Sequence, residues 1–391
     1  MKATKTRYLM LLLGFIGVII CYMDRSAISY AITPIKQAFH LNNQDFGIIS
    51  SAFGIGYLLM MPLGGILTDR HGARFIWTIA ALLWSVVTIL IGFSTGITML
   101  IILRVLLGVS EAPSFPSLTK AITNWLPINE RNRALALALA AVPFASVIGA
   151  PLSTWLIATF NWKIMFVFLG IAGLVWTIIW YLLFRDTPKQ SALINKKEIE
   201  YINSNLHIPH FNQKTDWKNI LFNKTFALNN YAFFAFGYLL FFGVTWLPGY
   251  LEQSFNLKLK EVGLFLIMPW LLASIFMIIT GIISDHIWAK TKSLHLSRSL
   301  IIAITLIISA ILFIPVVTIH NLNVDIIFIS LAIAFGLASN GCFYSLNADL
   351  APKYVATSLA IMDTCFALSG ILAPIITGYL TGISGNFLNS A

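Results

Sequence analysis

Residues 8–32 read YLMLLLGFIGVIICYMDRSAISYAI, and this stretch decides the fold. The run is almost wholly apolar and exceeds the ~20 residues that a helix needs to cross a bilayer. Asp24 and Arg25 therefore lie inside a hydrophobic span, where one charge costs ~2.5–3.5 kcal/mol on insertion scales. Neighbours on a helix point about 100° apart, so we expect each charge to find its partner on another helix. Such residues usually mark a substrate or proton path, and an ion pair that only joins helices is the alternative.

The composition of the whole chain agrees with this first span. Of 391 residues, 58% are hydrophobic and 10% are charged. So few charges cannot cover the surface of a water-soluble protein. We therefore predict an all-α membrane protein, because a helix satisfies its own backbone hydrogen bonds in lipid.

Eleven apolar runs are long enough to span a membrane. Residues 1–184 hold six of them and are predicted to form an N-terminal six-helix half. Residues 185–225 are polar and are predicted to form a cytoplasmic linker, and residues 226–391 a C-terminal half with five clear spans. The expected spans cover residues 8–32, 45–67, 75–97, 98–120, 134–158, 164–184, 227–251, 261–283, 299–319, 326–348 and 355–380.

The net charge of +10 reflects how the chain is oriented across the membrane and does not indicate a nucleic-acid partner. Of the 25 Lys and Arg residues, 19 fall at the N-terminus or in alternate loops, two lie inside spans and four lie on the other side. This asymmetry follows the positive-inside rule and predicts a cytoplasmic N-terminus. We expect a monomer in the lipid bilayer of a bacterial inner membrane. No metal-ligand cysteine spacing and no phosphate-binding loop occurs, so neither a cofactor nor an enzymatic activity is expected.

Two motifs occur once in each half. GILTDRHGAR at residues 65–74 is echoed by GIISDHIWAK at residues 281–290, and IGAPLST at 148–154 by ILAPIIT at 371–377. The first motif, expected in the loop after the second span, resembles the signature of the major facilitator superfamily. The resemblance implies two six-helix-type halves that rock about a midplane site, with the twelfth span missing here. It also implies glycines that let spans approach closely and a gating role for Asp69, Arg70, Arg74 and Asp285.

Within that superfamily, the chain is similar to the anion:cation symporters, which include hexuronate and sialin-type carriers. The resemblance covers essentially the whole chain and implies proton-coupled import of a small organic anion by alternating access. Two departures leave the substrate open: an apolar Ala140–Phe144 segment replaces a glutamine, and Asp363 replaces an asparagine. The markers are Tyr22-x-Asp24-Arg25, Tyr57, Arg104-x-x-x-Gly108-x-x-Glu111-Ala-Pro113, Trp125-Leu-Pro-x-x-Glu130, Asn161-Trp162-Lys163, Asp186-Thr-Pro188 and Thr245-Trp246-Leu-Pro248.

The ionisable residues of the first and fourth spans form the predicted site. Arg104 and Glu111 share one face of a helix, about 10 Å apart along its axis at 1.5 Å per residue. The resemblance implies that both spans border one cavity, in which Arg25 grips the substrate carboxylate. Asp24 and Glu111 are then the proton carriers, and Arg104 is their ion-pair partner. Two salt bridges that only hold the bundle together are the alternative.

Three further residues complete the predicted substrate site. Tyr22 shares a helical face with Arg25, and Tyr57 is included on the resemblance alone. Asn340 stands between Ser339 and Gly341, which indicates a broken or water-facing helix. Asp363 has three open roles: it binds a cationic group, carries a second proton, or donates as a neutral acid to a carbonyl.

Two other functions remain open. An exporter of an organic anion, a drug or an iron-chelating polycarboxylate needs similar arginines. A transport-dead membrane sensor or receptor is the alternative from another class, favoured by the missing twelfth span.

Overall fold

The computed structural model describes residues 4–203, 224–319, 321–350 and 355–384, and its regular elements in these ranges are all helices. Eleven of the described segments are long and apolar enough to cross a membrane, which confirms the predicted all-α membrane fold. The helices of the first half are α1 (Thr6–Tyr30), α2 (Ile32–Phe39), α3 (Asn43–His71), α4 (Ala73–Gly92), α5 (Ile97–Glu111), α6 (Ser114–Trp125), α7 (Ile128–Thr159) and α8 (Trp162–Leu183).

The remaining elements follow a short helical linker. The linker contains η1 (Pro188–Gln190) and α9 (Lys196–Asn203). The second half contains α11 (Lys224–Phe255), α12 (Leu259–Phe265), α13 (Ile267–Thr291), η2 (His295–Ser299), α14 (Leu300–Leu312), α15 (Ile314–Ile319), α16 (Leu322–Ala338), α17 (Asn340–Leu350) and α18 (Val355–Ser384).

Four of the predicted spans are each divided between two consecutive helices. The divisions fall at α5/α6, α12/α13, α14/α15 and α16/α17. The first occurs at Pro113, whose ring nitrogen cannot donate a backbone hydrogen bond. The last occurs at Ser339, directly before Asn340, and confirms the predicted break in this span.

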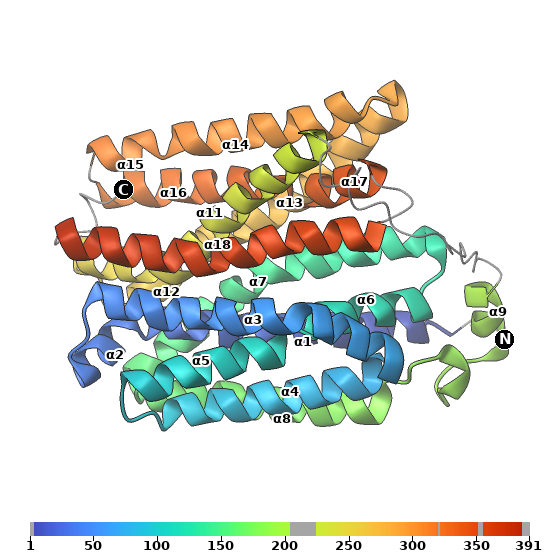
Figure 1. Cartoon of the computed structure of the whole chain (residues 1–391), viewed down its shortest axis with the longest axis horizontal. Helices are drawn as coiled ribbons and strands as arrows, with labels where there is room; N and C mark the ends of the chain where they lie inside the picture. Colours follow the sequence, from blue (N-terminus) through green and yellow to red (C-terminus); the bar gives the residue numbers. More distant parts are fainter. Residues whose placement is uncertain (1–3, 204–223, 320, 351–354, 385–391) are drawn as a thin grey trace.

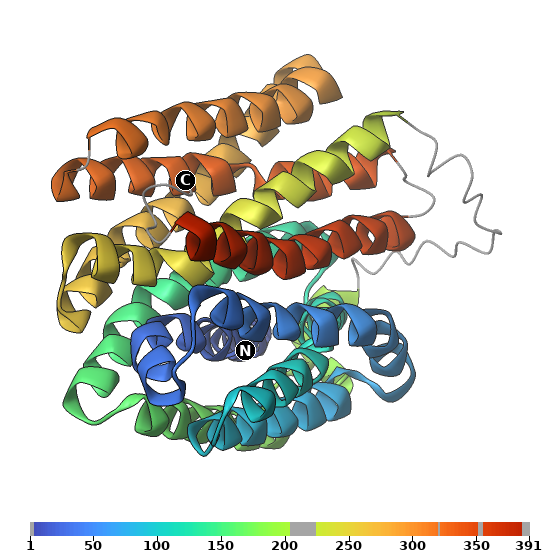
Figure 2. The same ribbon diagram turned by 60° about the vertical axis from the view of Figure 1, so that its left-hand side comes forward.

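The helices run roughly parallel in a single bundle (Figure 1). We call the end that carries α9 and the N-terminus the linker end, and the end that carries α2, α12 and α15 the far end. In Figure 1 the first half lies below and the second half above, with α18 directly beside α3 where the halves meet. Figure 2 shows the same division from another side. The central site is therefore bordered by helices from both halves.

The two halves are joined at the far end. The Ser51 hydroxyl on α3 donates a hydrogen bond of 2.9 Å to the carbonyl of Ile371 on α18. The Thr33 hydroxyl donates one of 2.7 Å to Glu252 on α11. A Cβ built on Gly47 would come within 2.7 Å of the Pro374 carbonyl, so the backbones of α3 and α18 nearly touch. No hydrogen bond between the halves occurs at the linker end of the described bundle.

Glycines also bring α3 and α5 into backbone contact inside the first half. A Cβ on Gly108 would collide with the Phe53 carbonyl and lie 2.7 Å from the Tyr57 amide. A Cβ on Gly56 would collide with the carbonyl of Val105. This contact fixes the two charged residues of α5 against the aromatic face of α3.

The repeated signature motif lies on helices and not in a loop, which corrects the prediction. Residues 65–71 form the last turns of α3, which ends at Gly72 with a positive φ of 86°. The echo at residues 281–290 lies wholly within α13. No atom of a neighbouring segment lies within 4 Å of a Cβ built on Gly65 or Gly281. These two glycines therefore do not mediate close helix contact here.

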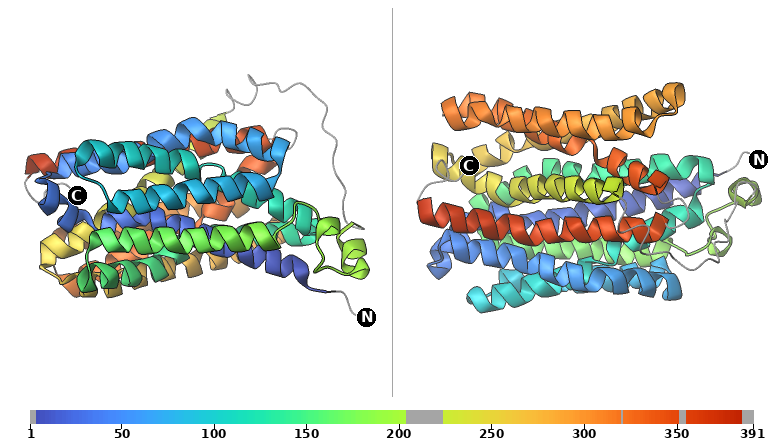
Figure 3. Two further views of the ribbon diagram at one scale, coloured as in Figure 1. Left: turned by 90° about the horizontal axis from the view of Figure 1, so that it is seen from below. Right: turned by 45° about the horizontal axis from the view of Figure 1, so that its top comes forward.

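A clamp of side chains at the linker end ties the linker to the first half. Figure 3 shows the linker helix α9 at the same end of the bundle as the N-terminus. The Arg7 guanidinium on α1 pairs with Glu198 on α9 and with Glu130 on α7, both at 2.9 Å. Glu198 is fully buried and also accepts hydrogen bonds from the backbone N–H groups of Thr6 and Arg7. A carboxylate at this position satisfies free N–H groups of the first turn of α1 and complements its dipole. Tyr201 donates a further hydrogen bond of 3.0 Å to Glu130.

Candidate functional site

A buried ion pair between α1 and α5 lies at the centre of the site. The Nε and Nη2 atoms of Arg25 donate hydrogen bonds of 3.0 and 2.9 Å to the same oxygen, Oε2, of Glu111. Glu111 is 0% exposed and Arg25 is 5% exposed. The other carboxylate oxygen of Glu111 has no hydrogen-bond partner. Both guanidinium nitrogens contact one carboxylate oxygen, so Arg25 and Glu111 do not form the bidentate pair in which each nitrogen has its own oxygen. An anion that binds Arg25 in the bidentate geometry can therefore compete with Glu111.

Aromatic rings surround the Arg25 guanidinium. Its central carbon lies 4.2 Å from the ring centre of Tyr22, 4.6 Å from that of Phe53 and 4.9 Å from that of Tyr57. Phe53 and Tyr57 stack on each other, with ring centres 5.7 Å apart. Cation–π contacts of this kind stabilise an arginine whose hydration has been removed.

Arg104 and Asp24 occupy different surroundings from those predicted. Arg104, expected as an ion-pair partner of the acids, makes no ion pair among the described residues. It contacts the backbone carbonyl of Arg25 at 3.5 Å and the Phe53 ring at 5.0 Å. Asp24 is fully buried and both its carboxylate oxygens lack a hydrogen-bond partner. It interacts electrostatically with Glu111 and with the Thr88 hydroxyl on α4, so it points into the first half.

A small cavity lies between the two halves beside this ion pair. Its volume is about 20 Å³, which is room for roughly one water molecule. Arg25 and Arg104 supply its charge, and Phe241, Thr245 and Pro374 are among its lining residues from the second half. In this conformation the central site is therefore almost completely closed around its two cations.

The second half contributes an acid and an amide as candidates. The Tyr344 hydroxyl on α17 donates a hydrogen bond of 3.0 Å to Oδ1 of Asp363 on α18. The Asp363 carboxylate also interacts electrostatically with Tyr22 and Tyr57 of the first half. Asn340 is buried and its side-chain oxygen has no hydrogen-bond partner. It does not line the small cavity in this conformation.

The predicted gating residues form contacts within each half. Asp69 pairs with Lys120 on α6 at 2.9 Å, and Asp285 pairs with Arg298 at 3.0 Å. Arg74 donates two hydrogen bonds to the Tyr181 carbonyl on α8. No polar contact is present for Arg70 in the described structure. The gating role itself stays a prediction, because none of these contacts crosses between the halves.

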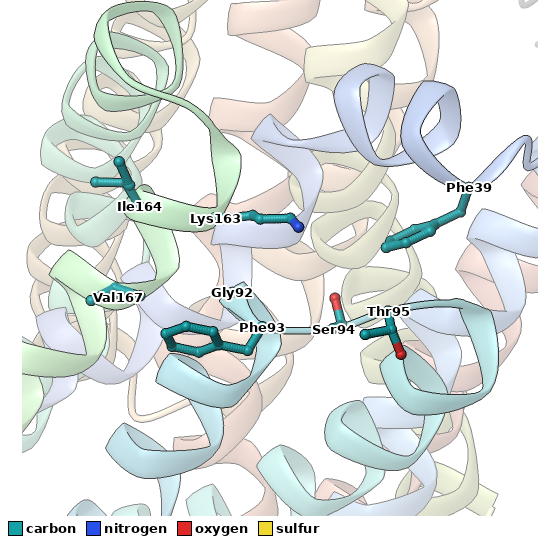
Figure 4. A pocket seen from close by; sticks show the side chains of 8 residues that line it. All are labelled: Phe39, Gly92, Phe93, Ser94, Thr95, Lys163, Ile164 and Val167. Atoms are coloured by element: carbon teal, nitrogen blue, oxygen red, sulfur yellow. The ribbon is translucent and has the colours of Figure 1, made fainter.

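A second cavity, of about 590 Å³, opens at the far end of the first half. Figure 4 shows Lys163 and Phe39 on the same side of the turn at residues 92–95, with the Lys163 amine pointing toward Phe39. Lys163 is exposed and is the one ionisable residue among those lining this cavity. The cavity holds neither an acid nor an aromatic cage, so it does not form part of the candidate site.

Several residues that were not predicted from the sequence complete the site. Phe53 lies beside both arginines, and Ser50 lines the small cavity. Phe53 lies four residues before Tyr57, and this helical spacing is the signal that identifies it. Cys21 and Thr88 interact with Glu111 and Asp24 respectively, but no local pattern marks them.

These features define a polytopic membrane protein with a charged central site between two helical halves. The profile of the Major Facilitator Superfamily matches residues 14–374, and the chain belongs to this superfamily of membrane transport proteins. It is 30% identical over 385 residues to "Probable sulfoacetate transporter SauU" of Cupriavidus necator, covering 98% of this chain and 89% of that protein. It is 31% identical over 407 residues to "Probable galactarate/D-glucarate transporter GudP" of Escherichia coli, covering 99% of this chain and 89% of that protein.

Two further comparisons agree with this family. The chain is 27% identical to "Hexuronate transporter" of Bacillus subtilis over 387 residues, covering 98% of this chain and 90% of that protein. A crystal structure of a bacterial homologue of the human lysosomal transporter Spinster, described as inward-facing and unoccupied, superposes with a TM-score of 0.80. At 18% identity, over 98% of this chain and 84% of the other, that likeness concerns the fold.

Proposed function

We propose that this protein is a secondary transporter that imports a small organic anion together with protons by alternating access. The observation that carries the proposal is the ion pair of Arg25 with Glu111 at the closed cavity between the halves. A guanidinium that borders the small cavity between the halves is positioned to bind a carboxylate or sulfonate. Relatives named for sulfoacetate, hexuronate and glucarate support an organic anion as substrate.

The ion pair supplies a route for coupling. A substrate carboxylate that binds Arg25 displaces Glu111, which then lies buried without a cation. A buried carboxylate in that state is stable only in the protonated form. Binding of the anion therefore draws a proton onto Glu111, and Asp24 lies next to it as a second acceptor. Proton and anion then cross together.

The contacts between the halves support a conformation that is closed at the far end. There the Thr33 hydroxyl donates to Glu252 and the Ser51 hydroxyl donates to the Ile371 carbonyl. We assign the linker end to the cytoplasm because of the distribution of Lys and Arg. The protein then lies in the bacterial inner membrane in a conformation closed to the outside.

Uptake by reconstituted protein tests this function. Vesicles with an inward proton gradient should accumulate labelled gluconate, glucuronate or sulfoacetate, and a protonophore should abolish the accumulation. Arg25→Lys keeps the charge but loses the planar donor pair, so it should weaken uptake while the protein stays folded. Accumulation that persists without a gradient would contradict proton coupling, and counterflow from preloaded vesicles would reveal export.

A further inference from the structure

Asp363 is an acid inside the bundle without a cation of its own. It lies on α18, is partly accessible to solvent, and accepts a hydrogen bond of 3.0 Å from Tyr344. None of the described Lys, Arg or His side chains forms an ion pair with it. An ionised carboxylate in such surroundings is costly unless a positive group lies nearby.

The charges of the central site do not balance. Among described side chains away from the helix ends, the spans carry two cations, Arg25 and Arg104. The same part of the bundle carries three acids, Asp24, Glu111 and Asp363. Arg25 pairs with Glu111 and Arg104 pairs with none of these acids, so three acids share two cations and Asp363 has no ion-pair partner among the described residues.

The acid and the cation have tyrosine neighbours in common. Tyr22 and Tyr57 lie against the guanidinium of Arg25 at 4.2 and 4.9 Å. The same two tyrosines interact electrostatically with the Asp363 carboxylate, which accepts a hydrogen bond of 3.0 Å from Tyr344. The site therefore carries a positive group on α1 and an acid on α18, both near tyrosine side chains.

We infer that the substrate carries a protonated amine in addition to its carboxylate or sulfonate. The acid group binds Arg25, and the ammonium lies between the Asp363 carboxylate and the tyrosine rings, which favour cations over their faces. This inference rests on the proposed function, since it names the substrate class of the same site. A simple monoanion would bind Arg25, but the Asp363 carboxylate would repel it.

Matched pairs of probes test the inference, because their members differ only in an amine or a hydroxyl. The pairs are lactate with alanine, malate with aspartate, isethionate with taurine, and D-gluconate with D-glucosaminate. Affinity is measured by thermal stabilisation of the purified full chain, and transport by uptake into vesicles. In the wild type, the amino member of at least one pair should bind about tenfold more tightly than its hydroxyl counterpart.

Two variants show whether Asp363 causes that preference. Asp363→Asn keeps the size and a hydrogen-bond acceptor but removes the charge, so the ratio between amino and hydroxyl members should fall to about one. Cys365→Ala changes the packing of the same helix two residues away and keeps the carboxylate, so it should retain the preference, which excludes a general loss of packing as the cause.

Different outcomes overturn different statements. Uptake of hydroxy acids without a preference for the amine overturns this inference and leaves the proposed function intact. An amine preference that is unchanged in Asp363→Asn also overturns it, because the cation must then bind elsewhere. If the wild type neither binds nor moves any member of the pairs, the proposed function is contradicted, and this inference with it.

Discussion

The first half buries two arginines and two acids on α1 and α5, whereas in the described second half Asp363 lies within α18 and the buried Arg298 and Asp325 lie near the starts of their helices. Around Asp363 the second half is aromatic, with Phe233 in ring contact with Phe343, Tyr344 and Phe366. The difference teaches that the halves have separate tasks. In the proposed function, the first half supplies the charge for binding and coupling, and the second supplies shape and one selective acid.

The outer helices of the halves differ as well. In the first half α4 packs along α8, where Trp77 and Trp84 contact Trp176 and a Cβ on Gly170 would lie 2.6 Å from the Ser85 carbonyl. In the second half, α14 lies at the outer edge of the bundle (Figure 3). Over an apolar stretch of 18 residues in each span, 56% of the residues are buried in α4 and 22% in the span that contains α14. The outer helix α4 of the first half is therefore more deeply buried than the outer helix α14 of the second half.

Removing Arg25 should produce the largest effect. Arg25→Ala leaves Glu111 buried without its cation, which costs ~3–5 kcal/mol in comparable pairs. We expect transport to fall about 100-fold or more and thermal stability to fall clearly. In the double variant Arg25→Ala/Glu111→Gln no unpaired charge remains, so stability should recover while transport stays lost. A single variant that keeps normal transport would show that the charged half does not bind the substrate.

Neutralising Glu111 should separate binding from coupling. Glu111→Gln keeps the shape of the side chain but cannot take up a proton when substrate displaces it. Exchange of substrate between equal concentrations should continue, whereas accumulation driven by a proton gradient should fall about tenfold or more. Counterflow and gradient-driven uptake, measured on the same vesicles, provide the two readouts. Equal loss of both would mean that Glu111 acts in binding alone.

Closure of the far end should depend on the glycines between the halves. A Cβ at Gly47 would lie 2.7 Å from the Pro374 carbonyl, so Gly47→Val should hold α3 away from α18. We expect transport to fall several-fold, which corresponds to a loss of about 1 kcal/mol in the stability of the closed conformation. Gly281→Ala is the matched control, because its added Cβ meets no atom within 4 Å. Cross-linking of cysteines at Ser51 and Ile371 measures the closure directly.

The clamp at the linker end should have the smallest effect. Burial raises the pKa of Glu130, but hydrogen bonds from Arg7 and Tyr201 outweigh it, so the net pKa lies below the usual value. The contribution of Glu130 to stability is thus present above its ordinary pKa of 4.5 and is lost as the pH falls through the lower folded value. Glu130→Gln should lower stability at pH 7 by about 1 kcal/mol or less. The difference from wild type should shrink in acid, and thermal unfolding at several pH values checks this.

The sequence predicted the number and order of the spans because ~20 apolar residues in succession have no other stable place than a bilayer. The break before Asn340 was also predictable, since a polar run interrupts an apolar one there. The extent of α3 was not predictable, because a helix continues past the apolar run until a residue such as Gly72 ends it. The short helices α2 and α9 likewise carry too little apolar sequence to be predicted as spans.

For the site, the sequence by itself determined which side chains are charged and that α1 and α5 carry most of them. Helical periodicity also placed Arg104 and Glu111 on one face. Only the tertiary structure decided that Glu111 pairs with Arg25, 86 residues away, while Arg104 contacts a ring and Asp24 turns toward α4. The physical reason is that periodicity defines the faces of one helix, whereas the rotation and depth of its neighbours are set by packing. Glycines such as Gly108 determine that packing through contacts that no local pattern reveals.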